Sequence, residues 1–167
     1  STTTEKAVFY RFCQALGLPT PELFAVVTRS AAGWGRGDLV LDGAPAFGRL
    51  LADLPRDLVV KPSGGGKGVG VRVLRRDGEG FIDLADGRHI SVAELWRAIT
   101  EHPDYEAHVV QERLRNNDAL ALAVPSRALH TIRLVTFVPR SGPTEISQSV
   151  IRLGIGGGVT DNFGDGS

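Results

Sequence analysis

The stretch LVVKPSGGGKGVGVRVL, residues 58–74, decides the fold prediction for this chain. Two runs rich in β-branched residues flank five glycines and two lysines, a pattern typical of strand, glycine-rich loop and strand. Val69, Val71 and Val73 recur at a period of two, which predicts that the loop leads into a strand and not into a helix. We call residues 63–70 the glycine loop.

The glycine loop has the composition of an anion-binding loop. Glycine lets backbone N–H groups approach phosphate oxygens because it carries no Cβ, and Ser63 and Lys67 add a hydroxyl and an ammonium group. A ligand-free flexible hairpin is the alternative, but ordering five glycines costs conformational entropy that a two-residue turn avoids. We therefore expect a β-hairpin flap over the phosphates of a nucleotide.

Phosphate motifs that precede a helix are not present in this stretch. Gly66-Lys67 does not complete a P-loop, because Lys61 stands where the first glycine is required and Gly68 follows the lysine. No G-x-G-x-x-G occurs in the loop either. On the flap interpretation, Lys61 on a strand makes a constant phosphate contact, while Lys67 at the mobile tip acts when the flap closes.

Composition narrows the class of protein. Lysine plus arginine equals aspartate plus glutamate at 19 each, so no net charge attracts nucleic acid or an anionic membrane surface. The single cysteine, Cys13, excludes an internal disulfide and a cysteine-based zinc site and favours a cytoplasmic location. No run approaches the roughly 18 apolar residues of a membrane span. The chain lacks methionine and stops in a glycine-rich run, so we expect a fragment.

Alternating helix and strand signals predict an α+β protein. Two capping boxes, Thr2 with Glu5 and Ser91 with Glu94, mark helix starts. An apolar stripe at helical spacing follows the first box and includes Cys13, which we expect in the core. Residues 28–43 read as a loop with one short extended piece, in which Trp34 is either an exposed contact or an anchor folded onto the body. The remaining expected elements are helices at 46–54 and 92–100, strands at 24–27, 108–114, 129–138 and 145–153, and a short apolar piece at 120–124.

Outside the glycine loop, few residues point to chemistry. Arg133 shares a strand face with Thr131, so this face is either a polar cleft or an ordinary solvated sheet face. The four histidines show no i, i+4 pairing, and no zinc protease site is supported. Asp161 and Asn162 are weak candidate ligands for magnesium, their default role being turn formation.

Several motifs in this order resemble the ATP-grasp superfamily over nearly the whole chain. VVKPSGGGKGVGV is similar to its lysine and glycine-rich flap, and Lys6 ahead of Gly-Leu-Pro-Thr-Pro at 17–21 is similar to its early lysine and turn. The run QERL at 111–114 resembles its adenine hinge, and TIRLVT at 131–136 and the segment from Asp161 resemble the sugar-transfer-associated subgroup.

The resemblance implies an ATP-grasp fold in which two α+β subdomains, 1–110 with the flap and 111–167 with the hinge strand, clamp ATP with Mg2+. It implies a catalytic role for Arg133, which would stabilise the transferred phosphoryl group or bind a carboxylate. The two lysines and the flap would cover the phosphates, residues 112–115 would meet adenine, and Asn117 or Asp118 would meet the ribose. The implied nucleotide-binding residues are Lys6, Lys61, Ser63, Gly64, Gly65, Gly66, Lys67, Gly68, Gln111, Glu112, Arg113, Leu114, Arg115 and Asp118.

The implied reaction is ATP-dependent carboxylate–amine ligation through an acyl-phosphate intermediate, in polysaccharide or cell-envelope biosynthesis. The family's later metal-binding E-x-N pair does not occur in this chain, which leaves the C-terminal subdomain incomplete and turnover in doubt. A non-catalytic nucleotide- or glycan-binding module is therefore the alternative. The choice between ATP and GTP, the acceptor substrate and the oligomeric state stay open.

Overall fold

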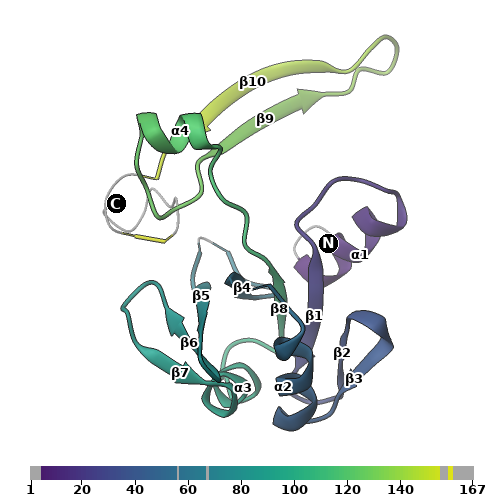
Figure 1. Cartoon of the computed structure of the whole chain (residues 1–167). Helices are drawn as coiled ribbons and strands as arrows, with labels where there is room; N and C mark the ends of the chain where they lie inside the picture. The colour runs from purple at the N-terminus through teal and green to yellow at the C-terminus, as the bar shows by residue number, and fades with distance from the viewer. Residues whose placement is uncertain (1–4, 56, 67, 155–157, 160–167) are drawn as a thin grey trace. The chain divides into compact units, whose positions relative to one another are not determined.

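The computed structural model describes residues 5–55, 57–66, 68–154 and 158–159 (Figure 1). The chain divides into two compact units, Ser1–Leu114 and Arg115–Ser167, called unit 1 and unit 2 below. Each unit has a sheet of its own, and each is described by itself. The subdomain boundary expected after residue 110 stays a prediction.

Unit 1 is built on an eight-stranded sheet in the order β3-β2-β1-β8-β4-β5-β6-β7. Every neighbouring pair in it is antiparallel. The glycine loop connects β4 to β5, close to the centre of the sheet. The strands are β1 Leu23–Thr28, β2 Gly33–Gly35, β3 Leu39–Leu41, β4 Asp57–Pro62, β5 Arg72–Asp77, β6 Gly80–Asp83, β7 His89–Ser91 and β8 Ala107–Glu112.

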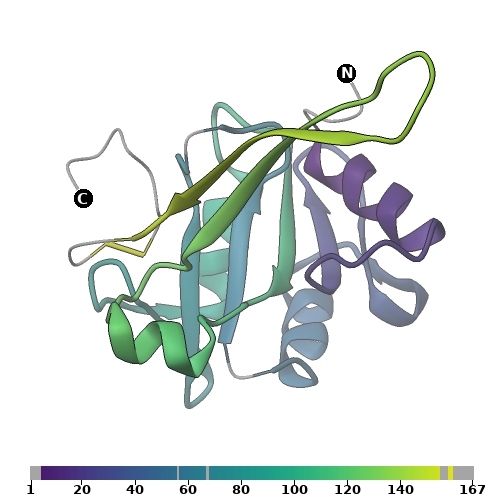
Figure 2. The same ribbon diagram turned by 90° about the horizontal axis from the view of Figure 1, so that it is seen from above.

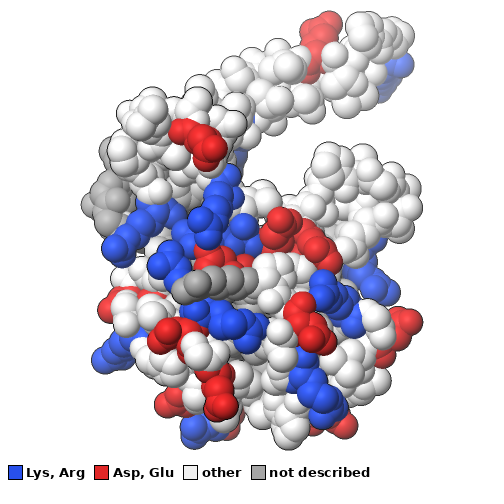
Figure 3. Space-filling view, viewed as in Figure 1, with Lys and Arg blue, Asp and Glu red and all other residues white. Residues whose placement is uncertain are grey.

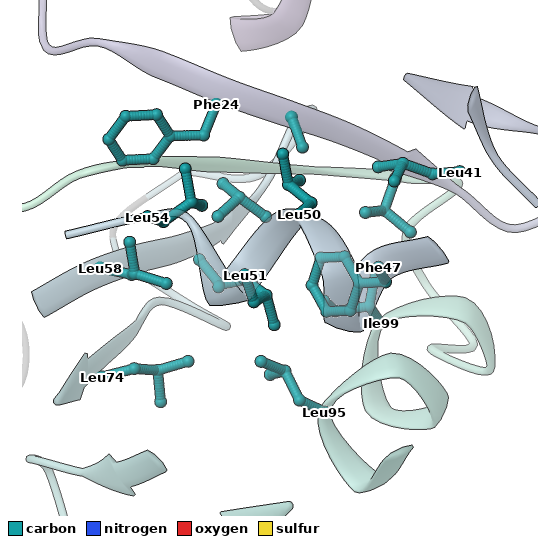
Figure 4. Close-up of a cluster of buried hydrophobic side chains, with 14 of the residues drawn as sticks. Phe24, Leu41, Phe47, Leu50, Leu51, Leu54, Leu58, Leu74, Leu95 and Ile99 are labelled. Atoms are coloured by element: carbon teal, nitrogen blue, oxygen red, sulfur yellow. The ribbon is translucent and has the colours of Figure 1, made fainter. Parts of the chain in front are cut away.

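The helices of unit 1 are α1 Lys6–Ala15, α2 Ala44–Ala52 and α3 Val92–Thr100. Of these, α2 and α3 cover one sheet face and enclose the main core with it (Figure 4). Trp96 is partly buried and packs against this core with its ring centroid 5.4 Å from that of Phe47. The largest fully buried core side chains are Phe24, Phe47, Phe81, Leu41, Leu51, Leu58, Leu74 and Leu95.

Helix α1 packs on the other sheet face (Figure 2). Val109 and Val110 are neighbours on β8 and therefore point to opposite faces. Val110 belongs to the core under α2 and α3, whereas Val109 packs with Tyr10 of α1 in a second cluster. Cys13 is buried as a free thiol, which confirms its expected place in the core.

The rest of the predicted apolar stripe of α1 is not buried. Val8, Phe9, Phe12 and Leu16 are all exposed, and the buried face of the helix carries Tyr10 instead. On the buried face, Tyr10 and Lys6 form hydrogen bonds with residues of the sheet and of the glycine loop. The spacing of apolar residues in the sequence does not predict such polar contacts. Thr2, the predicted first member of the capping box, lies outside the described residues.

Residues 28–43 were predicted as a loop with one short extended piece, and the structure has two short strands there instead of one. They form β2 and β3, an antiparallel pair joined by a 3₁₀ turn over Arg36–Asp38. Strands of three residues are too short to show a period of two, so the pattern was missed. Trp34 on β2 is half-buried against the second cluster, and the Arg11 guanidinium lies 4.6 Å from its ring centroid, so Trp34 is an anchor.

Unit 2 contains α4, Asp118–Ala123, and a hairpin of β9, Thr131–Phe137, with β10, Glu145–Arg152. Both strands confirm the sequence prediction with shorter bounds, while the apolar piece at 120–124 is helical. On the face shown in Figure 3, the hairpin displays few charged side chains apart from those near its tip. No helix within the described ranges combines the length and the apolar character needed to cross a bilayer.

His130 joins three segments of unit 2. Its backbone N–H donates to Asn116 Oδ1 at 2.7 Å, and its Nδ1 accepts from Gly154 N–H at 3.0 Å. Because Nδ1 is an acceptor, Nε2 carries the ring proton and donates to Val124 O at 2.9 Å. His130 is thus a satisfied structural histidine, in line with the absence of a zinc motif in the sequence.

The capping box predicted at Ser91 and Glu94 is present and allows a stability test. Ser91 Oγ accepts from Glu94 N–H at 3.2 Å, and the Glu94 carboxylate accepts from Ser91 N–H at 2.8 Å. We expect Ser91→Ala to lower the free energy of unfolding by about 1 kcal/mol, measured by urea denaturation. Glu101→Ala at the exposed other end of α3 is the control, expected within about 0.5 kcal/mol of the parent; equal values for both variants would contradict the capping role.

Candidate functional site

Strand β4 brings Lys61 to the sheet face that α1 covers. Leu58 and Val60 point into the core under α2 and α3, so Val59 and Lys61 must point to the opposite face. Lys61 stands near the end of β4, immediately before the glycine loop. Burial of the apolar residues of β4 therefore fixes where the ammonium group lies.

The first turn of α1 is tied to the start of the glycine loop. Lys6 Nζ donates to Ser63 O at 3.2 Å and to Gly65 O, and Lys6 N–H also donates to Ser63 O at 2.9 Å. Ser63 Oγ donates to Glu5 Oε2 at 3.0 Å and accepts from Ala7 N–H at 3.1 Å. A phosphate group bound by Lys6 would thus compete with carbonyl oxygens of the loop.

The two lysines and the glycine loop line one small cavity of about 100 Å³, which we call the lysine cavity. This volume is below the roughly 300–1,000 Å³ of a pocket that encloses a drug-sized ligand, so it suits part of a ligand such as a phosphate group. The lining residues are Lys6, Lys61, Pro62, Gly65, Gly66, Gly68, Val69 and Val71.

Burial and neighbouring charges change the pKa values of the two lysines that line the cavity. Burial lowers the pKa of Lys61 to about 8, and the nearby Lys6 ammonium lowers it further in the same direction. Burial also lowers the pKa of Lys6, against the opposing effect of the Glu5 carboxylate. Among the described residues neither lysine forms an ion pair, so the cavity holds two positive charges that a bound anion would stabilise.

The second half of the glycine loop forms turns and does not continue strand β5 backwards. Val69 N–H donates to Gly66 O at 3.2 Å and Val71 N–H to Gly68 O at 3.1 Å, which makes two successive turns. Strand β5 begins at Arg72, which confirms that the loop leads into a strand, although the alternating residues Val69 and Val71 lie in the turns before it. The turns form because Gly68 and Gly70 take φ values of 74° and 73° that valine avoids and glycine tolerates, a detail that alternation alone does not reveal.

The glycine loop packs closely against Pro62 and Tyr105, and we call these two residues the seat of the loop. A Cβ on Gly65 would lie 3.2 Å from Pro62 Cβ and 3.5 Å from the Tyr105 ring, and one on Gly70 would lie 2.8 Å from Pro62 Cγ. Tyr105 in turn packs 6.0 Å from the His108 ring. Glycine is therefore required in this loop for close approach to the sheet as well as for exposing amides.

Two histidines support this seat from the α2 and α3 face. The ring centroid of His102 lies 4.8 Å from Tyr105 and 5.5 Å from His108. Burial lowers the pKa of His108 to about 4, with help from the His102 and Arg72 charges, so His108 is neutral at physiological pH. Its buried Nδ1 has no hydrogen-bond partner among the described residues.

The predicted adenine hinge leaves the sheet at the end of β8. The Gln111 side chain is buried against α1, whereas Glu112 accepts from Glu22 N–H at 3.3 Å through its carboxylate. Arg113 bonds Asp57 Oδ2 of β4 at 3.1 Å, and Leu114 is exposed. The side chains of the predicted hinge residues thus mostly anchor this segment, which leaves its role in base binding a prediction.

A cluster of charged side chains around Asp57, on the sheet face that α1 covers, was not predicted from the sequence. Asp57 is buried and pairs with Arg113 at 3.1 Å and with Arg75 at 3.6 Å. Its position two residues before Val59 and four before Lys61 on β4 was a usable signal, since residues at a period of two share a face. On the face of unit 1 that Figure 3 shows, basic and acidic side chains are interspersed.

The other predicted site residues lie elsewhere in the chain. Arg115, Asp118 and the exposed Arg133 belong to unit 2, where Asp118 begins α4 and Arg133 lies on β9. Lys67, Asp161 and Asn162 fall outside the described residues. Within the described ranges, no three His, Cys, Asp or Glu side chains come together in a way that could hold a metal ion.

Larger hollows than the lysine cavity lie elsewhere on unit 1, and three of them are lined by described residues alone. Their volumes are about 510, 450 and 340 Å³. Residues around Trp96 line the first, residues around Arg76 the second and residues around Arg88 the third. None includes a predicted nucleotide-binding residue, so we assign the site by its chemistry and not by its size.

Comparison with known proteins gave one match. The family model described as sugar-transfer associated ATP-grasp matches residues 1–167. Neither the curated proteins nor the solved structures that were searched contained a match to the chain.

The seat of the glycine loop predicts different outcomes at two glycines. Alanine at Gly70 would combine a positive φ with a 2.8 Å contact to Pro62, whereas Gly66 faces open space. We expect Gly70→Ala to lower the free energy of unfolding by about 1–3 kcal/mol and Gly66→Ala to change it by less than about 1 kcal/mol. Denaturant unfolding of both variants measures this. A Gly70→Ala variant as stable as Gly66→Ala would rule out the close seat.

Proposed function

The chain belongs to the sugar-transfer-associated ATP-grasp family, and from this premise we propose that unit 1 binds the phosphates of ATP at the lysine cavity. The observation that carries the proposal is the pair of lysines facing one cavity beside a glycine loop. The chain has three lysines, Lys6, Lys61 and Lys67, and all three stand in the motifs of this site.

The lysine cavity has the chemistry that a phosphate chain needs. Lys61 is fixed on a strand and offers a constant positive charge below pH 8. Lys6 Nζ donates hydrogen bonds to the carbonyl oxygens of Ser63 and Gly65 in the glycine loop. If these carbonyls moved away, the Lys6 ammonium and the glycine loop would both be available to a phosphate group. Charge-assisted contacts of this kind stabilise phosphoryl groups by positioning and neutralising them.

We propose that the bound ATP serves a ligase reaction of the type that ATP-grasp enzymes carry out. A carboxylate oxygen of the substrate attacks the γ-phosphorus, the bond to the β-phosphate oxygen breaks, and ADP leaves. An amine then attacks the resulting acyl phosphate, loses a proton and expels inorganic phosphate. Lys6 and Lys61 would neutralise the charge that develops on the phosphate oxygens.

The remaining assignments complete this proposal. Arg133 of β9 is exposed and would bind the carboxylate or the phosphoryl group bidentately, and the backbone of residues 112–115 would meet the base. Mg2+, which ATP-grasp proteins generally bind together with ATP, would supply neutralisation of the phosphate charge, but no described residue is assigned to it. We propose that the acceptor belongs to polysaccharide or cell-envelope biosynthesis, a proposal that the sugar-transfer association in the family description supports.

Calorimetric titration of ATP into the protein at pH 7 tests the phosphate site. We expect Lys61→Ala to weaken binding by about 1.5–3 kcal/mol, the range for a hydrogen bond to a charged group, or roughly ten- to hundredfold. The matched control is Arg49→Ala, which removes one positive charge from the exposed side of α2. Arg49→Ala should bind like the parent.

Two results would count against the proposal. Equal ATP affinity of Lys61→Ala and the parent would remove the lysine cavity from the site. Absence of binding at millimolar ATP would remove nucleotide binding altogether. Where ATP binds, release of inorganic phosphate in the presence of pooled amines and carboxylates supports the ligase, whereas binding without release supports a non-catalytic module.

A further inference from the structure

Tyr10 is a buried tyrosine that meets a predicted phosphate-binding lysine, although no sequence motif includes it. It lies one turn after Lys6 on α1, so the two side chains share a helix face. Tyr10 is 8% exposed, and its hydroxyl oxygen accepts a hydrogen bond from Lys61 Nζ at 2.8 Å. One face of α1 thus supplies one lysine to the cavity and contacts the other.

Two further contacts surround the Tyr10 hydroxyl. The Lys61 ammonium lies 5.0 Å from the Tyr10 ring centroid, within reach of the negative face of the ring. The Gln111 amide of β8 lies beside the hydroxyl. Burial raises the pKa of Tyr10 and outweighs the opposite effect of Gln111, so the phenol stays neutral at physiological pH.

A neutral partner matters for a phosphate-binding lysine. Lysine has a flexible stem and loses rotamer entropy when its ammonium is held in one place. A carboxylate would hold the ammonium too, but it would also neutralise the charge. A phenol oxygen fixes the position of the ammonium and leaves its charge for the ligand.

The surroundings of Lys61 favour this role. Burial lowers the pKa of Lys61, and the charge of Lys6 on α1 lowers it further. The Glu5 carboxylate accepts a hydrogen bond from Ser63 Oγ. The nearest described carboxylate on β4, Asp57, pairs with two arginines. Among the described residues, the titratable groups in contact on this sheet face include Glu5 before α1, Lys6, Tyr10, Arg11 and Cys13 from α1 and, from the strands and the end of β8, Asp57, Lys61, Arg75 and Arg113.

We propose that Tyr10 is a positioning residue: its hydroxyl holds the Lys61 ammonium at the lysine cavity in its charged form, and Lys61 in turn binds phosphate. This inference rests on the proposed function, because it assigns a cause to the charge and place of Lys61. It adds a third side chain to the site from a position where sequence patterns indicate only helix packing.

The test compares the parent protein with Tyr10→Phe, which keeps the ring and removes the hydroxyl. With ¹³C-labelled lysine the chain gives signals from three lysines, and the pH midpoint of Lys61 is assigned with Lys61→Arg. We expect the Lys61 midpoint to fall below that of the parent, because the charged form loses an acceptor. Affinity for ATP and for inorganic tripolyphosphate should drop about tenfold, the effect of one hydrogen bond to a charged group.

Thr100→Val is the matched control, since it removes a hydroxyl from α3 on the opposite face of the sheet. It should leave both the Lys61 midpoint and the affinities unchanged. Thermal unfolding by circular dichroism verifies that each variant is folded.

The outcomes separate this inference from the proposed function. An unchanged Lys61 midpoint in Tyr10→Phe overturns the positioning role, whether or not thermal stability and binding change. A lowered midpoint with weaker tripolyphosphate binding supports it. A lowered midpoint in a protein that binds neither ATP nor tripolyphosphate leaves the contact with Lys61 standing and overturns the phosphate site.

Discussion

The site depends on two lysine ammonium groups that are partly buried at the same cavity, where the loss of hydration and, to a smaller extent, the charge of Lys6 disfavour the charged form of Lys61. Lys6 and Lys61 come from different elements, and neither is paired with a carboxylate among the described residues. Oxygen atoms without a formal charge hold them instead: the carbonyls of Ser63 and Gly65 hold Lys6, and the Tyr10 hydroxyl holds Lys61. Such an arrangement positions positive charge without cancelling it, which is what a phosphate chain requires.

This arrangement destabilises the folded protein in a defined pH range. The pKa of Lys61 in the folded state, about 8, lies below the 10.5 of an ordinary lysine. Between these values the unfolded chain binds more protons than the folded one, so the free energy of unfolding rises with pH across this window. Below pH 8 the cost of the buried ammonium is present in full, and a bound phosphate group would offset it by stabilising the charged form.

The sequence could predict those features that depend on residues close together along the chain. The β-branched run before the glycine loop and the box at Ser91 predicted a strand and a helix that the structure confirms. The ordered motifs pointed to the family that the comparison shows. Long-range contacts were not predictable: Tyr10 faces Lys61 because of how α1 docks, although the apolar spacing of the helix favoured another face. The turns at Gly68 and Gly70 depend on contacts with Pro62 and on positive φ values, which alternation of valines concealed.

The most direct test of the charged lysine cavity is the number of protons taken up when ATP binds. It is obtained by calorimetric titration in buffers of different ionisation enthalpy. A phosphate group beside Lys61 raises the pKa of this lysine, which is about 8 in the structure. Uptake should therefore be small at pH 6.5, rise toward one proton per ATP above pH 8, and largely vanish in Lys61→Ala. Binding of ATP above pH 8 without proton uptake would contradict the account.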